Sequence, residues 1–304
     1  MQIWTVGGGK GGTGKSFVAS GLGVCLAERG HRVVLVDADF GGANLHSYVG
    51  VYRPPRTLED FRVGRVPLTD ILVDTPIPNL TLLAGDLNAT DATGLSYSQK
   101  LKFFRHIKKL DADIVLIDLG AGSRKMTVDT FLLGDRMIAV TVPEKMAIEN
   151  LYQFMKNAYF RKLANLFRQV GIREAARQMW GDRKNLGIRS MDDLTKTLSN
   201  QYQRFADLHR REMGRFRIQL VLNKVREYRQ TETGVAVRSM AEKYLGIPSN
   251  FAGPVRYDRE FWTRLAKEPV HISRVTAARL MVDLSRIADV LLEPLAASGE
   301  DPES

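Results

Sequence analysis

Gly9–Ser16 reads GKGGTGKS, which fits the pattern G-x-x-x-x-G-K-[ST] of a phosphate-binding P-loop. An apolar stretch, Ile3–Val6, precedes the motif, and a stretch with helical spacing, Phe17–Arg29, follows it. A glycine-rich turn between a strand and a helix presents successive backbone N–H groups and a helix N-terminus, both of which bind anions. We therefore expect Lys15 to reach the β- and γ-phosphates of ATP, or the β-phosphate of ADP, and Ser16 to ligate Mg²⁺.

The rest of the sequence alternates apolar strands with helices. Continuous apolar strands separated by helices are typical of a mostly parallel, twisted sheet with helices on both faces. We therefore predict an α/β fold in which residues 1–304 form a single P-loop domain. Strands are predicted at Arg32–Val36, Leu80–Ala84, Ile114–Ile117, Met137–Val142, Ile218–Leu222 and Asn250–Val255, and late helices at about Glu232–Leu245 and Val275–Leu292.

Residues 148–216 interrupt this alternation and are predicted to be a helical insertion. The region has no convincing strand, whereas an ordinary crossover needs only about a dozen residues. Apolar residues follow helical spacing from Ile148 to Phe167, and Ser190 with Asp193 forms a capping-box pattern. That pattern predicts a second long helix, whose apolar face is marked by Leu194, Leu198, Phe205 and Leu208.

Basic charge is concentrated in the same region. Leu151–Phe216 holds 14 Lys and Arg against 6 Asp and Glu, and so carries +8 of the formal net charge of +10. The region is therefore either a set of solvated helix faces or a surface for an acidic partner, which includes DNA, an acidic protein and anionic lipid.

The amino-acid composition limits the cellular compartment that we expect for the protein and the chemistry that its side chains can carry out. Cys25 is the only cysteine, which excludes an internal disulfide and indicates a reducing cytoplasm. Met1–Val6 lacks the features of a signal peptide, and no apolar run approaches the roughly 20 residues of a membrane span. Residues 296–304 are small, polar and acidic, so we expect them to be disordered and to disfavour stable anchoring to an anionic membrane.

One lysine of the motif is not required by an ordinary P-loop. Lys10 directly follows the first glycine, and KGGTGKS thereby resembles the deviant Walker A motif of the MinD/ParA family. The resemblance implies that Lys10 crosses a dimer interface and contacts the phosphates of ATP held by the partner subunit. It covers about residues 1–147 and 217–293, and the stretch DADFGGANLH (Asp37–His46) looks closest to MinD- and FlhG-like members.

Three aspartates at strand ends match further positions of this family. Asp37 and Asp118 would lie on the Mg²⁺ side of the nucleotide, and Asp39 would help to position the attacking water. Gly120–Gly122 would begin the loop that senses the γ-phosphate. Carboxylate oxygens suit Mg²⁺, which neutralises the charge that develops between the β- and γ-phosphates.

The resemblance also implies a set of nucleotide contacts. In VLNK (Val221–Lys224), Asn223 matches the position that hydrogen-bonds adenine, and a looser match over Gly253–Val270 places Asp258 near the base. The catalytic residues would be Lys10, Lys15 and Asp39. The remaining contacts to ATP or ADP would come from Gly9, Lys10, Gly11, Gly12, Thr13, Gly14, Lys15, Ser16 and Phe17.

Three classes of function remain open. The first is a regulatory ATPase that dimerises with ATP and binds a protein partner. The second is an ATP-dependent synthetase of the cobyrinic acid a,c-diamide synthase or dethiobiotin synthetase type, from the same CobQ/CbiA superfamily. The third is a non-specific DNA-binding protein whose affinity ATP adjusts. Glutamine-dependent amide synthesis is excluded, because the only cysteine lies within the P-loop helix.

Overall fold

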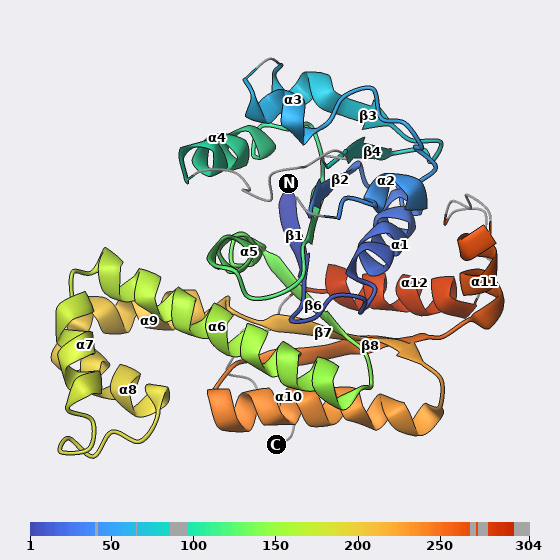
Figure 1. Cartoon of the computed structure of the whole chain (residues 1–304). Helices are drawn as coiled ribbons and strands as arrows, with labels where there is room; N and C mark the ends of the chain where they lie inside the picture. The colour runs from blue at the N-terminus through green and yellow to red at the C-terminus, as the bar shows by residue number, and fades with distance from the viewer. Residues whose placement is uncertain (40–41, 65, 86–96, 268–271, 273–278, 295–304) are drawn as a thin grey trace.

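A computed structural model of the chain describes residues 1–39, 42–64, 66–85, 97–267, 272 and 279–294 (Figure 1). Eight strands form one sheet in the order β3-β4-β2-β5-β1-β6-β7-β8. Neighbouring strands are parallel, except that β3 pairs antiparallel with β4 at one edge. The strands are β1 (Gln2–Gly7), β2 (Val33–Ala38), β3 (Leu72–Asp74), β4 (Leu80–Leu83), β5 (Ile114–Leu119), β6 (Arg136–Thr141), β7 (Ile218–Val225) and β8 (Ser249–Arg256).

Helices cover both faces of this sheet, as the sequence predicts (Figure 1). They are α1 (Lys15–Glu28), α2 (Leu45–Tyr48), α3 (Leu58–Arg62), α4 (Tyr97–Ile107), α5 (Lys125–Phe131), α6 (Lys145–Gln169), α7 (Arg173–Gly181), α8 (Met191–Gln201), α9 (Gln203–Gly214), α10 (Thr231–Leu245), α11 (Arg259–Lys267) and α12 (Arg279–Leu292), with 3₁₀ turns η1 (Leu68–Ile71) and η2 (Tyr228–Gln230).

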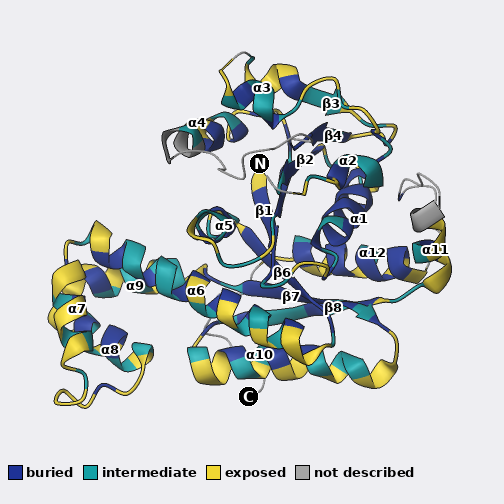
Figure 2. Ribbon diagram, in the orientation of Figure 1, coloured by how far each residue is buried: buried dark blue, intermediate teal, exposed yellow. Residues whose placement is uncertain are grey.

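The apolar runs of the strands divide between two buried clusters. Along β5, Val115 and Ile117 belong to the cluster that also holds α4, α5, α6 and α10, whereas Ile114 and Leu116 belong to the cluster with α1 and α12. Successive strand side chains point to opposite faces, so an uninterrupted apolar strand is what a sheet covered on both sides requires. All six residues of β5 are buried, and Figure 2 shows the neighbouring strand β6 as buried in the same way.

Residues 142–217 are all described, and they contain helices α6 to α9 and no strand. The capping box is confirmed: Ser190 Oγ accepts from the backbone N of Asp193, and the Asp193 carboxylate accepts from the backbone N of Ser190. The single long helix predicted after Ser190 is wrong, because Tyr202 is extended (φ −127°, ψ 91°) and separates α8 from α9. The break lets α9 pack beside α8 and brings Phe205 against Phe167, at a ring-centroid distance of 5.3 Å.

Other expectations have mixed outcomes. The short edge strand β3 and helix α7 are structured although no pattern predicted them. The late helix predicted from Val275 is described from Arg279 onward, and its first predicted residues lie outside the described part of the chain. The predicted disordered tail, 296–304, also lies outside it. Within the described residues, no helix combines the length and the apolar character that a membrane crossing requires.

Candidate functional site

The P-loop connects β1 to α1 at the carboxyl edge of the sheet. Gly12 and Gly14 have φ angles of 77° and 86°, in the left-handed region that favours glycine. Gly14 takes the N-cap position of α1, and no side chain caps the helix there. The first N–H groups of α1 therefore face the loop without a side-chain acceptor, as an anion site requires.

Helix α6 packs directly against this loop. A Cβ atom on Gly9 would lie 2.0 Å from the carbonyl oxygen of Asn150, so only glycine fits there. The N-cap residue of α6, Glu144, pairs with Lys10 at 3.4 Å between Oε2 and Nζ. Both side chains are accessible, with 40% of Lys10 and 65% of Glu144 exposed. The side chain of Lys10 therefore lies at the outer surface of the P-loop, where an exposed carboxylate is its partner.

Lys15, in contrast, is buried. Its side chain folds back over the loop, and Nζ donates to the carbonyl of Lys10 at 3.4 Å. Burial lowers the pKa of the ammonium, while the charges of Asp118 and Asp39 act in the opposite direction. A buried ammonium is stabilised by an anion in contact with it, and a phosphate in the loop would supply that anion.

Two of the predicted carboxylates are brought together by the sheet itself. Asp37 on β2 pairs in register with Asp118 on β5, and Asp118 also pairs with Val6 on β1. Asp37 accepts hydrogen bonds from the backbone N–H groups of Asp39 and Leu45, at 3.2 and 3.0 Å. Burial raises the pKa of Asp37 to about 6, and these backbone bonds limit the rise.

Asp118 is the least compensated group of the site. It is 1% exposed, and neither carboxylate oxygen has a hydrogen-bond partner among the described residues. Burial, followed by the charge of Asp37, raises its pKa well above the usual range, although the nearby Ser16 hydroxyl and Lys15 oppose this. A buried carboxylate without a partner is a chemically suitable ligand for a divalent cation, so the residues present fit the Mg²⁺ that the sequence predicts.

Asp39 lies just beyond β2, next to the loop that follows β5. A Cβ atom on Gly120 would come within 2.8 Å of Asp39 Oδ1, so this glycine allows the two loops to approach. Within the described residues, no group of three or more His, Cys, Asp or Glu side chains could hold a metal alone. Mg²⁺ typically keeps several waters and takes one or two carboxylates together with phosphate oxygens, which Ser16, Asp37 and Asp118 could complement.

Asn223 and Lys224 hold the outer side of the P-loop. Asn223 Nδ2 donates to the carbonyl of Thr13 at 2.9 Å, and Lys224 Nζ donates to the carbonyl of Gly12 at 2.8 Å. Lys224 adopts φ 57°, which is unfavourable for a lysine, and its N–H bonds to Asn223 Oδ1. Asn223, which the resemblance places at adenine, thus also contacts the loop backbone, and the consecutive carbonyls of Gly12 and Thr13 both accept hydrogen bonds from this segment.

Phe17 and Asp258 are also predicted to contact the nucleotide, and their side chains contact other residues. The Phe17 ring is 1% exposed and packs on Phe261 and Trp262, at centroid distances of 5.3 and 5.0 Å. Phe17 can therefore reach a nucleotide only through its backbone. Asp258 Oδ1 accepts from the backbone N of Phe261 at 3.0 Å at the start of α11, and Asp258 lines a pocket at the carboxyl ends of β7 and β8.

Two contacts were missed from the sequence. Glu144, the partner of Lys10, is 134 residues away along the chain, and no sequence motif predicts this pair. Lys224 stands next to Asn223 in the quoted VLNK, but its bond to the P-loop depends on its unusual backbone angle. Phe40 and Gly41 of the DADFGGANLH stretch lie outside the described residues.

Comparisons with known proteins identify the family of the chain. A family model, the CobQ/CobB/MinD/ParA nucleotide binding domain, matches residues 4–270. The antiactivator FleN of Pseudomonas aeruginosa is 30% identical over 175 residues, which are 55% of this chain and 62% of FleN. The chromosome partitioning protein ParA of Caulobacter vibrioides is 30% identical over 168 residues, 51% of this chain and 61% of ParA. The chain thus spans less than two thirds of these curated relatives.

Solved structures show the same fold. The MinC:MinD cell division protein complex of Aquifex aeolicus contains a chain that matches with a TM-score of 0.64 and 18% identity, over 99% of this chain and 100% of that one. MinD of Pyrococcus horikoshii, complexed with Mg-ADP, matches with a TM-score of 0.61 and 20% identity, over 96% of each chain.

The P-loop contacts of Lys224 predict a loss of affinity that does not depend on the base. Replacing Lys224 by Ala should weaken binding of Mg·ATP, Mg·GTP and Mg·tripolyphosphate by similar factors, about three- to tenfold for one lost hydrogen bond. Calorimetric titration of the three ligands measures this. Lys243→Ala, which removes an exposed lysine on α10, is the control. A loss confined to ATP would instead indicate that this segment reads adenine.

The unpartnered Asp118 predicts opposite effects on stability and on metal binding. A carboxyl whose pKa is raised in the folded state stabilises that state at low pH, and this contribution is lost as pH rises through the folded pKa. At pH 7.5, Asp118→Asn should therefore raise the free energy of unfolding of the ligand-free protein by about 1–3 kcal/mol. It should also abolish the additional stabilisation by Mg·ADP over ADP alone.

Denaturant unfolding with and without the ligands tests both effects. Asp113→Asn, which changes the residue directly before the same strand, is the matched control. Arg32 lowers the pKa of Asp113 to about 2, so this change should not stabilise the protein and should leave the effect of Mg·ADP intact. A destabilised Asp118→Asn protein that still responds to Mg²⁺ would contradict the assignment.

Proposed function

Because the chain belongs to the CobQ/CobB/MinD/ParA nucleotide binding domain family, we propose that it is an ATPase that acts as a dimerisation switch. Its ATP-bound form would be a homodimer that binds a protein partner and thereby positions or regulates a cellular cargo. Hydrolysis to ADP would separate the subunits and release the partner. The nucleotide acts through the γ-phosphate, whose contacts order the loops and the interface.

The observation that carries this proposal is the surface position of Lys10. Its pair with Glu144 is solvent-exposed, and such pairs contribute only about 0–1 kcal/mol. A γ-phosphate bears more charge than one carboxylate and accepts stronger hydrogen bonds, so it would replace Glu144 as the partner of Lys10. Since Lys15 already serves the phosphates of the same subunit, the phosphate that Lys10 reaches would be the one bound by a second copy.

The chemistry proposed for the site uses the residues described above. Mg²⁺, when bound by Ser16, Asp37 and Asp118, would offset the charge that develops between the β- and γ-phosphates. Lys15 would bind the oxygens of the transferred group, and Asp39, beside Gly120, would orient the attacking water. Asn223 and Lys224 would keep the P-loop N–H groups directed inward during this step.

The names of related proteins support a role in cellular organisation. Relatives include an antiactivator, a chromosome partitioning protein and, from Helicobacter pylori, a flagellum site-determining protein. One structural neighbour was solved as a MinC:MinD complex, which supports a protein partner. A metabolic synthetase is the alternative, and its oligomeric state need not depend on ATP.

Dimerisation should require both ATP and Lys10. With Asp39→Ala to prevent turnover, light scattering after size exclusion should give a monomer with Mg·ADP and a dimer with Mg·ATP. Adding Lys10→Ala should return the ATP form to a monomer, because the phosphate then lacks its partner in the second subunit. Steady-state phosphate release by the protein with native Asp39 tests the ATPase itself, which Asp39→Ala should slow 10²-fold or more.

Lys145→Ala is the control for this experiment, since it removes an exposed lysine beside Glu144 and should leave the ATP-dependent dimer intact. A dimer that forms equally without nucleotide, or that persists without Lys10, would refute the switch and favour the synthetase.

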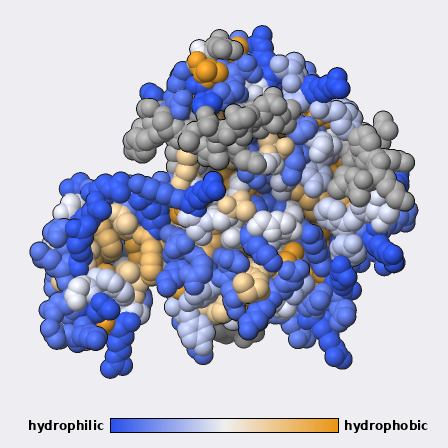
Figure 3. Space-filling view, viewed as in Figure 1, coloured by the Kyte–Doolittle hydropathy of each residue, from blue (hydrophilic) through white to orange (hydrophobic). Residues whose placement is uncertain are grey.

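The insertion favours a second candidate function, which is DNA binding. Its acidic side chains are largely engaged: Glu174, Asp192, Asp207 and Glu212 form ion pairs, and Asp193 caps α8. Among the described residues, the exposed side chains without an ion pair include Arg168, Arg173, Lys184, Arg189, Arg204 and Arg215. Hydrophilic side chains accordingly rim the insertion in Figure 3, around a smaller apolar area.

DNA affinity, if it depends on this surface, should fall steeply with salt. Each neutralised phosphate contributes a log–log slope of about −0.9. Replacing Arg173, Lys184 and Arg189 by Ala should make the log–log slope less negative, by the contribution of up to about three phosphate contacts. Fluorescence anisotropy with Mg·ATP present measures this. The triple change Arg229, Lys243 and Arg286 to Ala removes the same charge from the core and should preserve the slope. No binding at low salt would exclude this function.

A further inference from the structure

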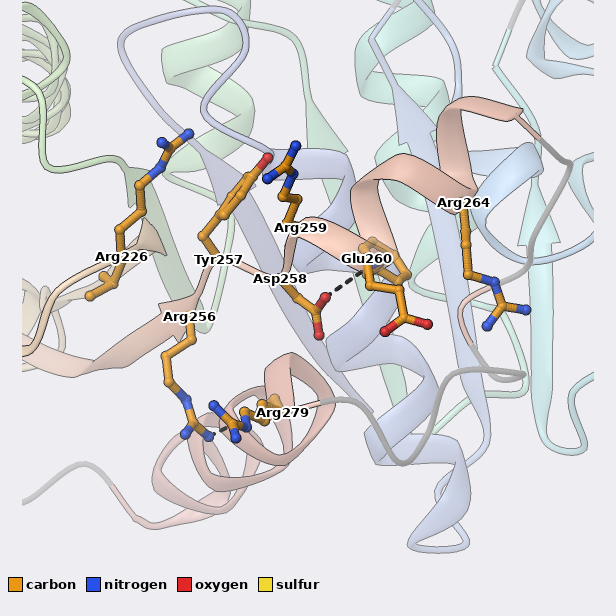
Figure 4. Close-up of a pocket in the computed structure, with 10 residues that line it drawn as sticks. Arg226, Arg256, Tyr257, Asp258, Arg259, Glu260, Arg264 and Arg279 are labelled. Atoms are coloured by element: carbon orange, nitrogen blue, oxygen red, sulfur yellow. Dashed lines mark hydrogen bonds between the residues drawn. The ribbon is translucent and has the colours of Figure 1, made fainter.

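A groove of about 460 Å³ lies between helices α4, α5 and α6 at the amino end of β1. Its lining comes from the end of α4, from α5 and the turn after it, from the second half of α6, and from Ile3 on β1. Figure 1 shows the three helices on one face of the sheet. The P-loop and the pocket that Asp258 lines (Figure 4) lie at the opposite, carboxyl edge. We call this hollow the α4–α6 groove, and it is separate from the nucleotide site.

The base of the α4–α6 groove is apolar. Ile3 and Phe104 line it and are 4% and 9% exposed, so most of their surface is buried. Leu133, in the turn between α5 and β6, is 38% exposed and adds a large apolar side chain that solvent reaches. Contact with an apolar group of a partner would remove this surface from water, and burial of that kind is the dominant favourable contribution to most protein association.

The rim of the α4–α6 groove is basic. Four cationic side chains, Arg105, Lys108, Arg161 and Arg168, line the groove together with a single carboxylate, that of Asp129. Asp129 already accepts two hydrogen bonds from Arg161, at 2.6 and 3.0 Å. Lys108 and Arg168 are exposed, and neither forms an ion pair with any residue that the structure describes. The groove therefore attracts anionic groups, because a concave surface lined by one sign of charge concentrates its field.

The cationic side chains form two rows, one on each of two helices. Arg105 and Lys108 are three residues apart at the end of α4, whereas Arg161, Asn165 and Arg168 follow one face of α6 at intervals of four and three residues. The row on α6 covers about 10 Å of helix, which is longer than a single carboxylate or phosphate group. Rows of this length beside an apolar base match a peptide that carries several carboxylates and at least one apolar side chain along its length.

The α4–α6 groove is distant from the residues proposed for dimerisation. Lys10 pairs with Glu144, which is the N-cap residue of α6. Arg161, the first residue of α6 in the groove, lies about 25 Å farther along the helix at 1.5 Å per residue. Gln169, the last residue of α6, also lines the groove, so the lining continues to the end of this helix. A partner bound in the groove therefore leaves Lys10 accessible to a second copy of the chain.

We propose that the α4–α6 groove binds an acidic, amphipathic segment of a partner protein. An apolar side chain of the segment covers Leu133, and its carboxylates pair with Lys108 on α4 and with Arg168 on α6. This contact does not require the ATP-bound dimer, so it is distinct from the nucleotide-dependent partner binding proposed above. The partner can remain attached at the amino edge of the sheet while the nucleotide at the carboxyl edge is hydrolysed and exchanged.

The test uses a phage-displayed library of random dodecapeptides as the probe and the full chain saturated with Mg·ADP. Counter-selection against Lys108→Glu combined with Arg168→Glu keeps only peptides that need the groove, and these should be acidic with a large apolar residue. Fluorescence anisotropy of one such synthetic peptide should show at least tenfold weaker binding to the double variant, because two charge-assisted contacts become repulsive. Leu133→Asp should also weaken binding. Arg229→Glu with Arg286→Glu reverses the same charge elsewhere and should leave the affinity unchanged.

Two further measurements separate this proposal from the proposed functions. Lys15→Ala should lose binding of Mg·ADP and keep the peptide, whereas Lys108→Glu with Arg168→Glu should lose the peptide and keep the ATP-dependent dimer. The triple change of Arg173, Lys184 and Arg189 to Ala, designed for DNA, should leave peptide affinity unchanged. Thermal unfolding of each variant checks that the fold is intact. The proposal is overturned if no selected peptide depends on the groove, if the selected peptides lack carboxylates, or if the groove variants weaken binding of phosphatidylglycerol vesicles and not of peptides.

Discussion

The burial of unlike charges at the ends of three parallel strands is the constraint on which this molecule depends. The register of β2, β5 and β1 places Asp37 beside Asp118 and next to the strand that leads into the P-loop. Lys15 is buried at the same edge. Its ammonium does not fully compensate the two carboxyls, and Asp118 has no hydrogen-bond partner within the described chain. The packing of the rest of the sheet therefore offsets the cost of burying these charged groups, which form a site suited to phosphate and metal.

The sheet tolerates this cost because its faces are otherwise apolar. Uninterrupted apolar strands pack against α1 and α12 on one side and against α4, α5, α6 and α10 on the other. The polar residues of the site appear only where the strands end, which is the position that open parallel sheets offer to ligands. Fold and site are therefore linked, because β2 and β5 are apolar along most of their length and carry Asp37 and Asp118 near their carboxyl ends.

Sequence patterns were sufficient where the cause is local. The P-loop, the aspartates that follow apolar strands and the capping box at Ser190 each involve residues a few positions apart, so their geometry could be predicted. Contacts that depend on the assembled fold could not be predicted: Glu144 reaches Lys10 from the end of another strand, and Asn223 donates to the P-loop carbonyl of Thr13. The break at Tyr202 was also invisible, because the apolar spacing continues through it and only the packing of Phe205 against Phe167 explains the turn.

The contact between Gly9 and Asn150 has a mechanical consequence. Helix α6 contains 25 residues, which at 1.5 Å per residue makes it about 37 Å long. Its first turns touch the P-loop, and its last turns pack against the helices that carry the basic surface. A rotation of about 5° at the loop would move the far end by about 3 Å, which is enough to change which side chains meet there. Helix α6 can therefore transmit a small rotation from its contact with Gly9, where there is no room for a methyl group, to its far end.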